Sequence, residues 1–554
     1  MKLTGKQHRQ LREAIQSDFV NIEVVKIMLR EEMDLSLNNI VSGKNYNQIA
    51  SNLINQLEAQ NRIVDFIEAA LEYVPNQQEL LNCQQQFMQK SVPSNQELLN
   101  CQQQFVQKSE LEQLPTPPIN FSKTWFQVLR IVTINSSIIT LICIIIRFLG
   151  ILQPYELWAF DRLIQLRGSL RPHEPDDRIL VVEVTSNDLE EWDEKERTHG
   201  ASLPDEAILK LLQKLDQYNP KAIGLDIYRP FKATESKLAE KLRDDSRLFA
   251  VCKVPAENSD KEAPPPEVPK NRLGFSDLIQ DPDGVLRRYL FHMDFEPTLD
   301  EERRLGIEGE KFCQTNYAIS FQLVLSYLGE KPQLTKQDFY KIRNVVFKPL
   351  DYYTGGYQGN IDALGHQVLL DYRNFRGFEG NSPKNVAERL TLNQVIQDGV
   401  TTEDIEEKYQ DRIILIGRTT EGEEDYWSTP LGGPEVPGVF IHAQIVSQIL
   451  RAVEDGRPLL WYWPQWVEVL WVWVWATVGG IIVWYNRQPK YIPVMVIVGI
   501  ISVVNIGSCI FVFLVFNGWL PLIPPIIALI FTALIIFYKQ NLTVKSNNLL
   551  VNRK

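Results

Sequence analysis

The chain has 554 residues, a formal net charge of −12 at pH 7 and charged side chains at 23% of its positions. Its length is enough for two or three domains. The negative charge gives no electrostatic footprint for nucleic acid, so we expect no nucleic-acid partner. The six cysteines form no CxxC or Cys/His pattern that would indicate a zinc site. The sequence leaves open whether Cys252 and Cys313 form a disulfide.

Residues 1–74 show the apolar spacing of a small helical bundle. Thr4 followed by Gln7 matches a capping box, and apolar residues then recur at i, i+3 and i+4. The expected core residues are Leu11, Ile15, Val25, Met28, Leu29, Ile49, Leu53, Leu57, Ile63, Phe66, Ile67 and Ala70. No catalytic motif lies in this segment, so the periodicity alone predicts a bundle and nothing more.

Three stretches within residues 1–82 point to a known family. They are LTGKQHRQLREAIQSDF, NNIVSGKNYNQIASNLINQLEAQNR and IVDFIEAALEYVPNQQEL. Together they resemble the type-1 effector-associated domain of bacteria, which is a death-fold-like helical adaptor. The resemblance implies a protein-interaction role, in which the domain pairs with a copy of the same domain on an effector or sensor protein. The implied partner is therefore a cytoplasmic protein that carries a matching effector-associated domain.

A duplicated Gln-rich spacer and a proline linker occupy residues 76–123. NQQELLNCQQQFMQKS and NQELLNCQQQFVQKS are near-identical copies. We interpret them as a polar spacer. The alternative is a pair of short helices that self-associate, which leaves a homo-oligomer open. Pro115, Pro117 and Pro118 then indicate a stiff linker towards the next segment.

The apolar residues are concentrated in uncharged runs that predict four transmembrane helices. Each run reaches or can be extended to roughly the 20 residues that cross a hydrocarbon core, and backbone within lipid must be helical to satisfy its hydrogen bonds. Asn517-Gly518-Trp519 and the prolines that follow divide the last long run into two helices. The predicted helices are residues 125–152, 466–485, 492–516 and 519–538.

Positive charge in the short loops predicts the orientation, because Lys and Arg mark the cytoplasmic side of a membrane protein. Arg487 and Lys490 lie between the second and third predicted helices, and further cations lie in the tail 539–554. Residues 1–123 and this tail are therefore expected in the cytoplasm, and residues 153–465 outside it. The N-terminus has no cleavable signal sequence, so the first helix is expected to anchor the chain in the inner (plasma) membrane.

Residues 153–460 alternate strand-like and helix-like segments. The apolar runs are RILVVEVT at 178–185, KAIGLDIY at 221–228, VLLDY at 368–372 and RIILIG at 412–417. Apolar strands that alternate with helices indicate a mainly parallel sheet covered on both faces. The expected fold class is multi-domain, with an N-terminal all-α helical bundle, four transmembrane helices arranged one plus three, and an extracytoplasmic α/β domain.

The same region contains motifs of a second family. They are DDRILVVEVTSNDL, NPKAIGLDIYRP, DPDGVLRR, RIILIGRTTEGEEDYWSTPLGG and VPGVFIHAQIVSQIL. In order and spacing they resemble the type-2 CHASE domain, an extracellular sensory module that typically follows one transmembrane helix and precedes three. The resemblance implies a small extracytoplasmic ligand. Many relatives carry a kinase or nucleotide cyclase after the last helix, whereas this chain has only residues 539–554 there, so the output is expected from the N-terminal domain or the membrane helices.

Open parallel sheets bind ligands beyond the carboxyl ends of their strands, and this rule selects candidate ligand-binding residues. The candidates are Asp226, Asp425, Asp283, Arg287, Glu183, Arg418 and His442. We expect Asp226 and Asp425 to approach one another around a pocket open to the outside, with Asp283 or Arg287 nearby. Structural interpretations remain beside this one: Pro282-Asp283-Gly284 is an ordinary turn, Asp226 can brace the backbone, and His442 can pack or cap a helix.

Catalysis has less support in the sequence. There is no GxSxG elbow, no HExxH and no pair of histidines at metal spacing, so we expect no enzyme, no cofactor and no metal. A carboxylate metal site of Asp226, Asp283 and Asp425 stays open. The favoured function is a transmembrane sensor-adaptor. The alternatives are a pore-forming or bilayer-perturbing effector switched by the N-terminal domain, and a membrane-tethered periplasmic hydrolase.

Overall fold

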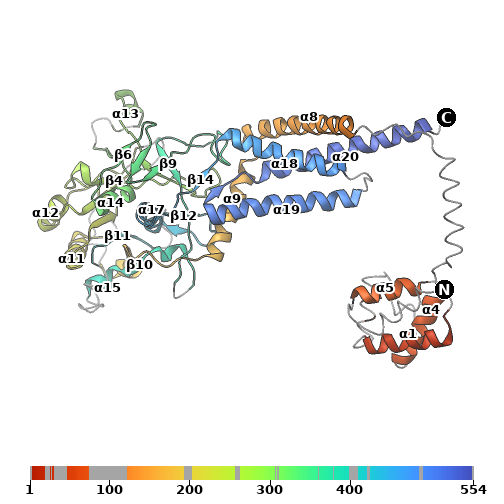
Figure 1. Cartoon of the computed structure of the whole chain (residues 1–554). Helices are drawn as coiled ribbons and strands as arrows, with labels where there is room; N and C mark the ends of the chain where they lie inside the picture. The colour runs from red at the N-terminus through yellow and green to blue at the C-terminus, as the bar shows by residue number, and fades with distance from the viewer. Residues whose placement is uncertain are drawn as a thin grey trace. The chain divides into compact units, whose positions relative to one another are not determined.

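A computed structural model gives the fold and divides the chain into two units, Met1–Asn120 and Phe121–Lys554, which we describe separately (Figure 1). It describes residues 3–18, 25, 28–29, 46–60, 62–73, 121–192, 203–255, 262–305, 307, 311–359, 361–377, 380–397, 410–420, 425–485 and 491–551. The duplicated spacer, the proline linker, and the loop cations Arg487 and Lys490 lie outside these residues.

The N-terminal unit is helical and has its own core. Its helices include α1 (Gly5–Asp18), α4 (Tyr46–Ala59) and α5 (Ile63–Tyr73). The capping box is confirmed, because the Thr4 amide donates to Gln7 Oε1 at 2.9 Å and the Gln7 amide donates to Thr4 Oγ1 at 3.4 Å. The expected core residues are buried except Ile49, which is only partly buried. Ala50 and Ile54 are buried on α4 instead.

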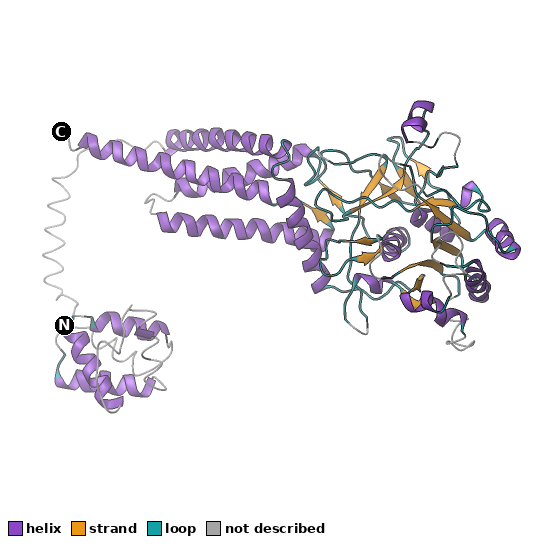
Figure 2. Cartoon of the chain, turned by 180° about the vertical axis from the view of Figure 1, so that it is seen from behind, coloured by secondary structure: helices purple, strands orange, loops and turns teal. Residues whose placement is uncertain are grey.

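Four helices of the second unit are long and apolar enough to cross a membrane. They are α8 (Phe121–Phe148), α18 (Gln465–Tyr485), α19 (Tyr491–Phe516) and α20 (Ile523–Val551), and they run side by side in Figures 1 and 2. The fourth begins at Ile523 rather than at residue 519, because Gly518–Trp519 forms the short strand β15. This strand pairs with β14 (Trp461–Tyr462) just before α18.

The centre of the α/β domain is a six-stranded parallel sheet with the strand order β10-β1-β11-β2-β3-β4. The strands are β1 (Ile179–Val184), β2 (Ala222–Asp226), β3 (Leu248–Cys252), β4 (Leu273–Phe275), β10 (Glu388–Thr391) and β11 (Ile413–Arg418). Of these six strands, β11 comes last in the chain, yet it lies between β1 and β2. The loop after β11 therefore meets the loop after β2 at one edge of the sheet.

Helices cover both faces of this sheet, as Figure 2 shows. The face formed by residues such as Leu180 and Ile223 packs against α11 (Asp205–Leu215), α12 (Ser236–Asp244) and α15 (Leu392–Ile396). The opposite face packs against α14 (Ile319–Leu328) and α17 (Gly438–Val453). Burial on both faces explains why β1, β2 and β11 read as continuous apolar runs.

The run at 368–372 departs from the expectation of a parallel strand. It contributes only to β9 (His366–Leu369), which pairs antiparallel with β5 (Arg288–His292) in a separate two-stranded sheet. The other elements are α9 (Gln153–Leu170), α10 (Ser186–Glu190), α13 (Leu299–Leu305), the 3-10 turns Asp216–Tyr218, Lys270–Arg272 and Pro383–Val386, and the strands β6 (Gln333–Leu334), β7 (Tyr340–Ile342), β8 (Val345–Phe347), β12 (Tyr426–Trp427) and β13 (Val436–Pro437). Cys252 and Cys313 form a disulfide.

The turn between α19 and α20 is inserted into the core of the α/β domain. Trp519 is 2% exposed and its ring centroid lies 4.7 Å from that of Phe160 on α9. Gly355 and Gly356 make room for it, because a Cβ atom at either position would lie within 2.8 Å of the indole. The hydrophobic core therefore continues from the sheet into the ends of the membrane helices.

Buried charges reinforce this junction. Arg147, at the end of α8, forms an ion pair with Glu468 of α18 and donates to the carbonyl of Gly355. Glu156 of α9 accepts the amide of Ile523 at 2.6 Å, so a carboxylate occupies the first turn of α20, where the helix dipole favours negative charge. The membrane helices and the α/β domain are thus held together by polar contacts as well as by packing.

The separate core of the N-terminal unit leads to a stability prediction. Residues 1–75 expressed alone should be soluble and helical, because Leu53 and its described neighbours form a hydrophobic core within this segment. Leu53→Asp should unfold the fragment, because an unpaired charge would be buried at a cost of about 3 kcal/mol or more. Circular dichroism measures the helix content. Asn55→Asp is the matched control, since it adds the same charge at an exposed position of α4, and a fully helical Leu53→Asp fragment would contradict the core assignment.

Candidate functional site

Asp226 is the last residue of β2 and lies at the carboxyl edge of the parallel sheet. Side chains alternate between the faces of a strand. Leu225 packs against the α11 and α12 layer, so Asp226 points to the opposite face, which α17 covers. Its partner in β11 is Gly417, and a Cβ atom on Gly417 would lie 2.6 Å from Val439 of α17. The helix therefore approaches the sheet closely beside Asp226.

Asp425 lies in the loop after β11 and packs against the first turn of α17. Its Oδ1 accepts the indole N–H of Trp427 at 2.7 Å, and its backbone carbonyl accepts the amide of Gly438 at 3.1 Å. A Cβ atom on Gly438 would lie 2.4 Å from both carboxylate oxygens. Glycine at this position therefore lets the carboxylate lie against the positive end of the helix dipole.

A second group of side chains joins this pair from the other side of the sheet edge. The Tyr228 hydroxyl lies 2.7 Å from Ser276 Oγ, and Asp277 accepts the amide of Val254 at 3.0 Å. The ring of His442 hydrogen-bonds to the backbone of Ser276, while its Nδ1 is buried without a hydrogen-bond partner among the described residues. The loops after β2, β4 and β11 and helix α17 all contribute to one cluster.

The carboxyl groups of this cluster repel one another when they are ionised. Burial raises the pKa of Asp226 to about 7, and burial together with the Asp226 carboxylate raises that of Asp425 to about 6. Burial also raises the pKa of Asp277 to about 6 and lowers that of His442 to about 4. The histidine is consequently neutral at pH 7 and does not compensate the carboxylates. Asp425 packs its carboxylate against Gly438, which accounts for the effect of burial on its pKa, but another part of the residue is exposed. Tyr228 is 38% exposed, so the cluster reaches the surface.

Asp226, Asp425 and His442 lie together in the structure. Arg287 instead forms ion pairs in a separate group of carboxylates. The Arg287 guanidinium is buried and pairs with Asp161 and Asp281 at 2.8 Å and with Asp283 at 2.6 Å. Its positive charge is matched there, so the expectation that Asp283 or Arg287 serves the Asp226 pair has no support in these contacts. The turn interpretation accounts for this segment, because the Gly284 amide donates to the Asp281 carbonyl at 2.8 Å.

Glu183 and Arg418 lie at the same sheet edge but make local contacts. Glu183 faces Arg389 at 3.7 Å, and Arg418 donates to Thr420 Oγ1 at 3.3 Å. Among the described residues, no three His, Cys, Asp or Glu side chains gather in a way that could hold a metal ion. The carboxylate metal site of Asp226, Asp283 and Asp425, which the sequence leaves open, is not such a group, and Asp283 pairs with Arg287 instead.

The sequence interpretation missed Tyr228, Ser276 and Asp277. Ser276 and Asp277 follow β4, which has only three residues, Leu273–Phe275, and gives no recognisable strand signal. Had this strand been identified, the rule that selected Asp226 would also have selected Asp277. Tyr228 lies two residues beyond the end of β2, so the rule that ligands bind beyond the carboxyl ends of parallel strands could have selected it as well.

Comparison with known proteins agrees with both resemblances. The model of the CHASE2 domain matches residues 138–481, and that of effector-associated domain 1 matches residues 1–87. No curated protein and no solved structure matches the chain. The two matched families are sensory and adaptor domains rather than enzymes. The CHASE2 match covers more than half of the chain and includes parts of α8 and α18. The chain therefore belongs to the CHASE2 family, as a membrane signalling protein with an effector-associated domain at its N-terminus.

Proposed function

We propose that the protein is a sensor-adaptor of the inner (plasma) membrane. Its α/β domain, residues 153–465, lies outside the cytoplasm and detects a small polar ligand. Its N-terminal domain lies in the cytoplasm with the C-terminal tail and recruits a protein that carries a matching effector-associated domain. The two families support a sensor and an adaptor, and the four apolar helices provide the membrane part.

One observation carries this proposal: the α/β domain and the membrane helices share a single hydrophobic core. Trp519 lies between α19 and α20 yet belongs to the core cluster that contains β1, α14 and α17. Packed cores do not deform continuously, so a rearrangement of one part forces its neighbours to repack. A ligand that binds one arrangement of the domain more tightly would thereby bias the membrane helices.

The disulfide supports placing the α/β domain outside the cytoplasm. Cys252 and Cys313 both belong to this domain and are bonded, and disulfides persist in oxidising compartments such as the periplasm. The loop cations predict the same orientation by an independent principle. Both arguments support an outer location of residues 153–465, and the loop cations also support an inner location of the two chain ends.

The cluster around Asp226 is the proposed ligand site. No group among the described residues donates a hydrogen bond to Asp226, whereas Asp425 is held by Trp427 and by α17. Asp425 therefore orients the site, and Asp226 has free capacity to accept hydrogen bonds. A small ligand with a cationic group or several hydrogen-bond donors would offset the repulsion between the carboxylates. Strongly shifted pKa values are typical of such functional sites.

Some polar residues of the membrane helices join neighbouring helices, whereas the side chains of Ser136 and Asn505 are buried without a hydrogen-bond partner among the described residues. Lys539 Nζ donates to Asn135 Oδ1 at 2.9 Å and links α20 to α8, while the Trp473 indole donates to Ser137 at 3.2 Å and links α18 to α8. Such bonds join helices in lipid. No observation favours the pore-forming alternative over the sensor-adaptor.

The proposed partner can be tested directly. The fragment 1–75 should capture a protein that carries an effector-associated domain from lysate of the source cell, identified by mass spectrometry. Leu53→Asp should abolish capture, and Asn55→Asp should retain it. Capture that is the same with Leu53→Asp, or ion conductance of the full chain in planar bilayers, would count against an adaptor and towards a membrane effector.

The orientation has its own test. A reporter enzyme that is active only outside the cytoplasm should be active when inserted at Pro265 and inactive when fused after Lys554. This result is expected from the loop cations and from the disulfide. A reporter that is inactive at Pro265 and active after Lys554 would reverse the assignment of the two sides.

The proposed site predicts a pH-dependent effect of Asp226→Asn. Because the pKa of Asp226 is raised to about 7, the folded protein retains a proton that the unfolded chain releases near pH 4, so this group lowers stability progressively as the pH rises from 4 to 7. The variant should therefore be more stable than wild type at pH 8 and close to it below pH 4. A rise of the pKa from 3.8 to about 7 corresponds to about 4 kcal/mol, and because Asp226 is only partly buried the expected gain is about 2–4 kcal/mol. Thermal unfolding at both pH values measures the difference.

Asp283→Asn is the matched control, because Arg287 holds the pKa of Asp283 below its usual value. The stability that Asp283 contributes is present above its unfolded-state pKa, so its loss should lower the unfolding temperature at pH 8. A loss of stability in Asp226→Asn at pH 8 would instead show that Asp226 braces the fold, and the site proposal would lose its principal residue.

A further inference from the structure

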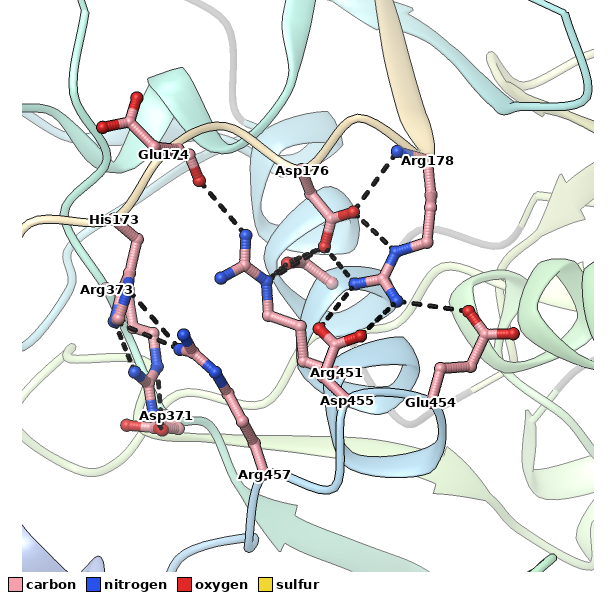
Figure 3. Close-up of polar contacts among 11 residues, drawn as sticks. His173, Glu174, Asp176, Arg178, Asp371, Arg373, Arg451, Glu454, Asp455 and Arg457 are labelled. Carbon is pink, nitrogen blue, oxygen red and sulfur yellow. Dashed lines mark hydrogen bonds and ion pairs between the residues drawn. The ribbon is translucent and has the colours of Figure 1, made fainter.

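A small cavity lies at the opposite end of the parallel strands from Asp226. It has a volume of about 20 Å³, which is room for about one water-sized group. Its walls include Arg373, Arg451 and Arg457, together with the amide or hydroxyl side chains of Gln444 and Ser447. Figure 3 shows these arginines arranged around His173 and Asp176. Three guanidinium groups thus line one small space, Arg373 from the segment after β9 and Arg451 and Arg457 from the end of α17 and the turn that follows it.

The carboxylates near this cavity are already shared between arginines. Asp371 pairs with Arg167 and also accepts Arg373 Nε at 3.0 Å. Asp176 likewise pairs with Arg178 at 2.8 Å and with Arg451 at 3.0 Å. Arg178 also pairs with Glu454 at 3.2 Å and with Asp455 at 3.1 Å. The carboxylates therefore match most of the positive charge around the cavity, and the guanidinium that remains without an ion-pair partner among the described residues is that of Arg457.

Arg457 is the least compensated of these groups. Its contacts within the described chain are with the ring nitrogens of His173 at 3.4 Å, and no described carboxylate lies within ion-pair distance. Burial and the neighbouring charges of Arg373 and Arg451 lower its pKa. Burial and the surrounding arginines also lower the pKa of His173 to about 3, so the histidine is neutral at pH 7. The guanidinium of Arg457 is thus available to an anion.

We infer that this cavity binds a phosphate group, presented either by inorganic phosphate or by an anionic phospholipid headgroup. Guanidinium forks match the oxygens of phosphate and carboxylate. Three guanidinium groups around one space can meet oxygens in three directions, which suits the tetrahedral oxygens of phosphate better than the two oxygens of a carboxylate. The small volume admits one or two of these oxygens, while the rest of the ligand stays outside. This binding site is separate from the cluster at Asp226 and does not depend on the proposed signalling role.

The cavity lies beside the junction with the membrane helices, which places a lipid headgroup within reach. Its lining continues to Pro458 and Leu459, which precede β14 and α18. The Pro458 carbonyl accepts the side-chain amide of Asn517 at 2.8 Å, and Arg167 donates to Asn517 Oδ1 at 3.3 Å. Asp371, shared by Arg167 and Arg373, connects the cavity to the same turn between α19 and α20.

The test uses the full chain purified in an uncharged detergent that contains no phospholipid. Inorganic phosphate is titrated at constant ionic strength against chloride, and phosphatidylglycerol is titrated against phosphatidylcholine in mixed micelles. At least one phosphate source should raise the thermal unfolding temperature in a saturable manner, by about 2 °C or more. A response to inorganic phosphate alone identifies the free ion, and a response to phosphatidylglycerol alone identifies the headgroup.

Arg457→Gln should weaken this response about tenfold or more in apparent Kd, because a charge-assisted contact is lost. Arg376→Gln is the matched control: it removes an arginine of the same domain whose exposed side chain pairs with Glu174 at 2.7 Å. If Arg457→Gln does not fold, Arg457→Lys takes its place, since it keeps the charge and loses the fork. No saturable response to either source, wild-type affinity in the Arg457 variant, or an equal loss in Arg376→Gln would each overturn the proposal.

Discussion

The burial of Trp519 in the core of the α/β domain is the constraint on which the rest of the second unit depends. This residue follows the third apolar helix and precedes the fourth, yet its ring packs on Phe160 and Tyr357. Both flanking helices are thereby fixed in position relative to the sheet. Gly355 and Gly356 are required for the same reason, because any side chain at either position would occupy the space of the indole. The junction is a packed core and not a flexible connection.

The buried ion pairs at this junction have a different role from that of the packing. Removing charges from water is costly, and a buried ion pair commonly adds little net stability. Such pairs do define geometry: Arg147 fixes α8 against Glu468 of α18, and Arg167 fixes α9 against Asp371. Loss of one partner would leave a buried unpaired charge, which costs about 3–5 kcal/mol. These contacts therefore disfavour alternative arrangements of the helices more than they strengthen the native one.

The sequence predicts those features that depend on local pattern. Strands β1, β2 and β11 were predictable because they are buried on both faces, and Asp226 and Asp425 because parallel strands end at one edge. Strand β4 was missed because three residues carry no periodic signal. The ion pair between Arg287 and Asp161 joins residues 126 positions apart. It depends on tertiary packing, so no local pattern predicts it. Trp519 likewise reads locally as part of a turn, and only the fold shows where that turn is inserted.

Helix α17 connects the two ends of the sheet where the proposed sites lie. Its first turn packs against Asp425 and carries His442, and its last turn carries Arg451 at the arginine cavity. A helix of 16 residues is about 24 Å long and moves largely as a rigid body. It is buried against β1 and β11 along its length, so displacement of its first turn by a ligand would shift Arg451 against Asp176. That shift would reach the segment at Pro458, which is bonded to the turn between the last two membrane helices. One rigid element thus gives binding at the outer edge of the sheet a physical route to the membrane.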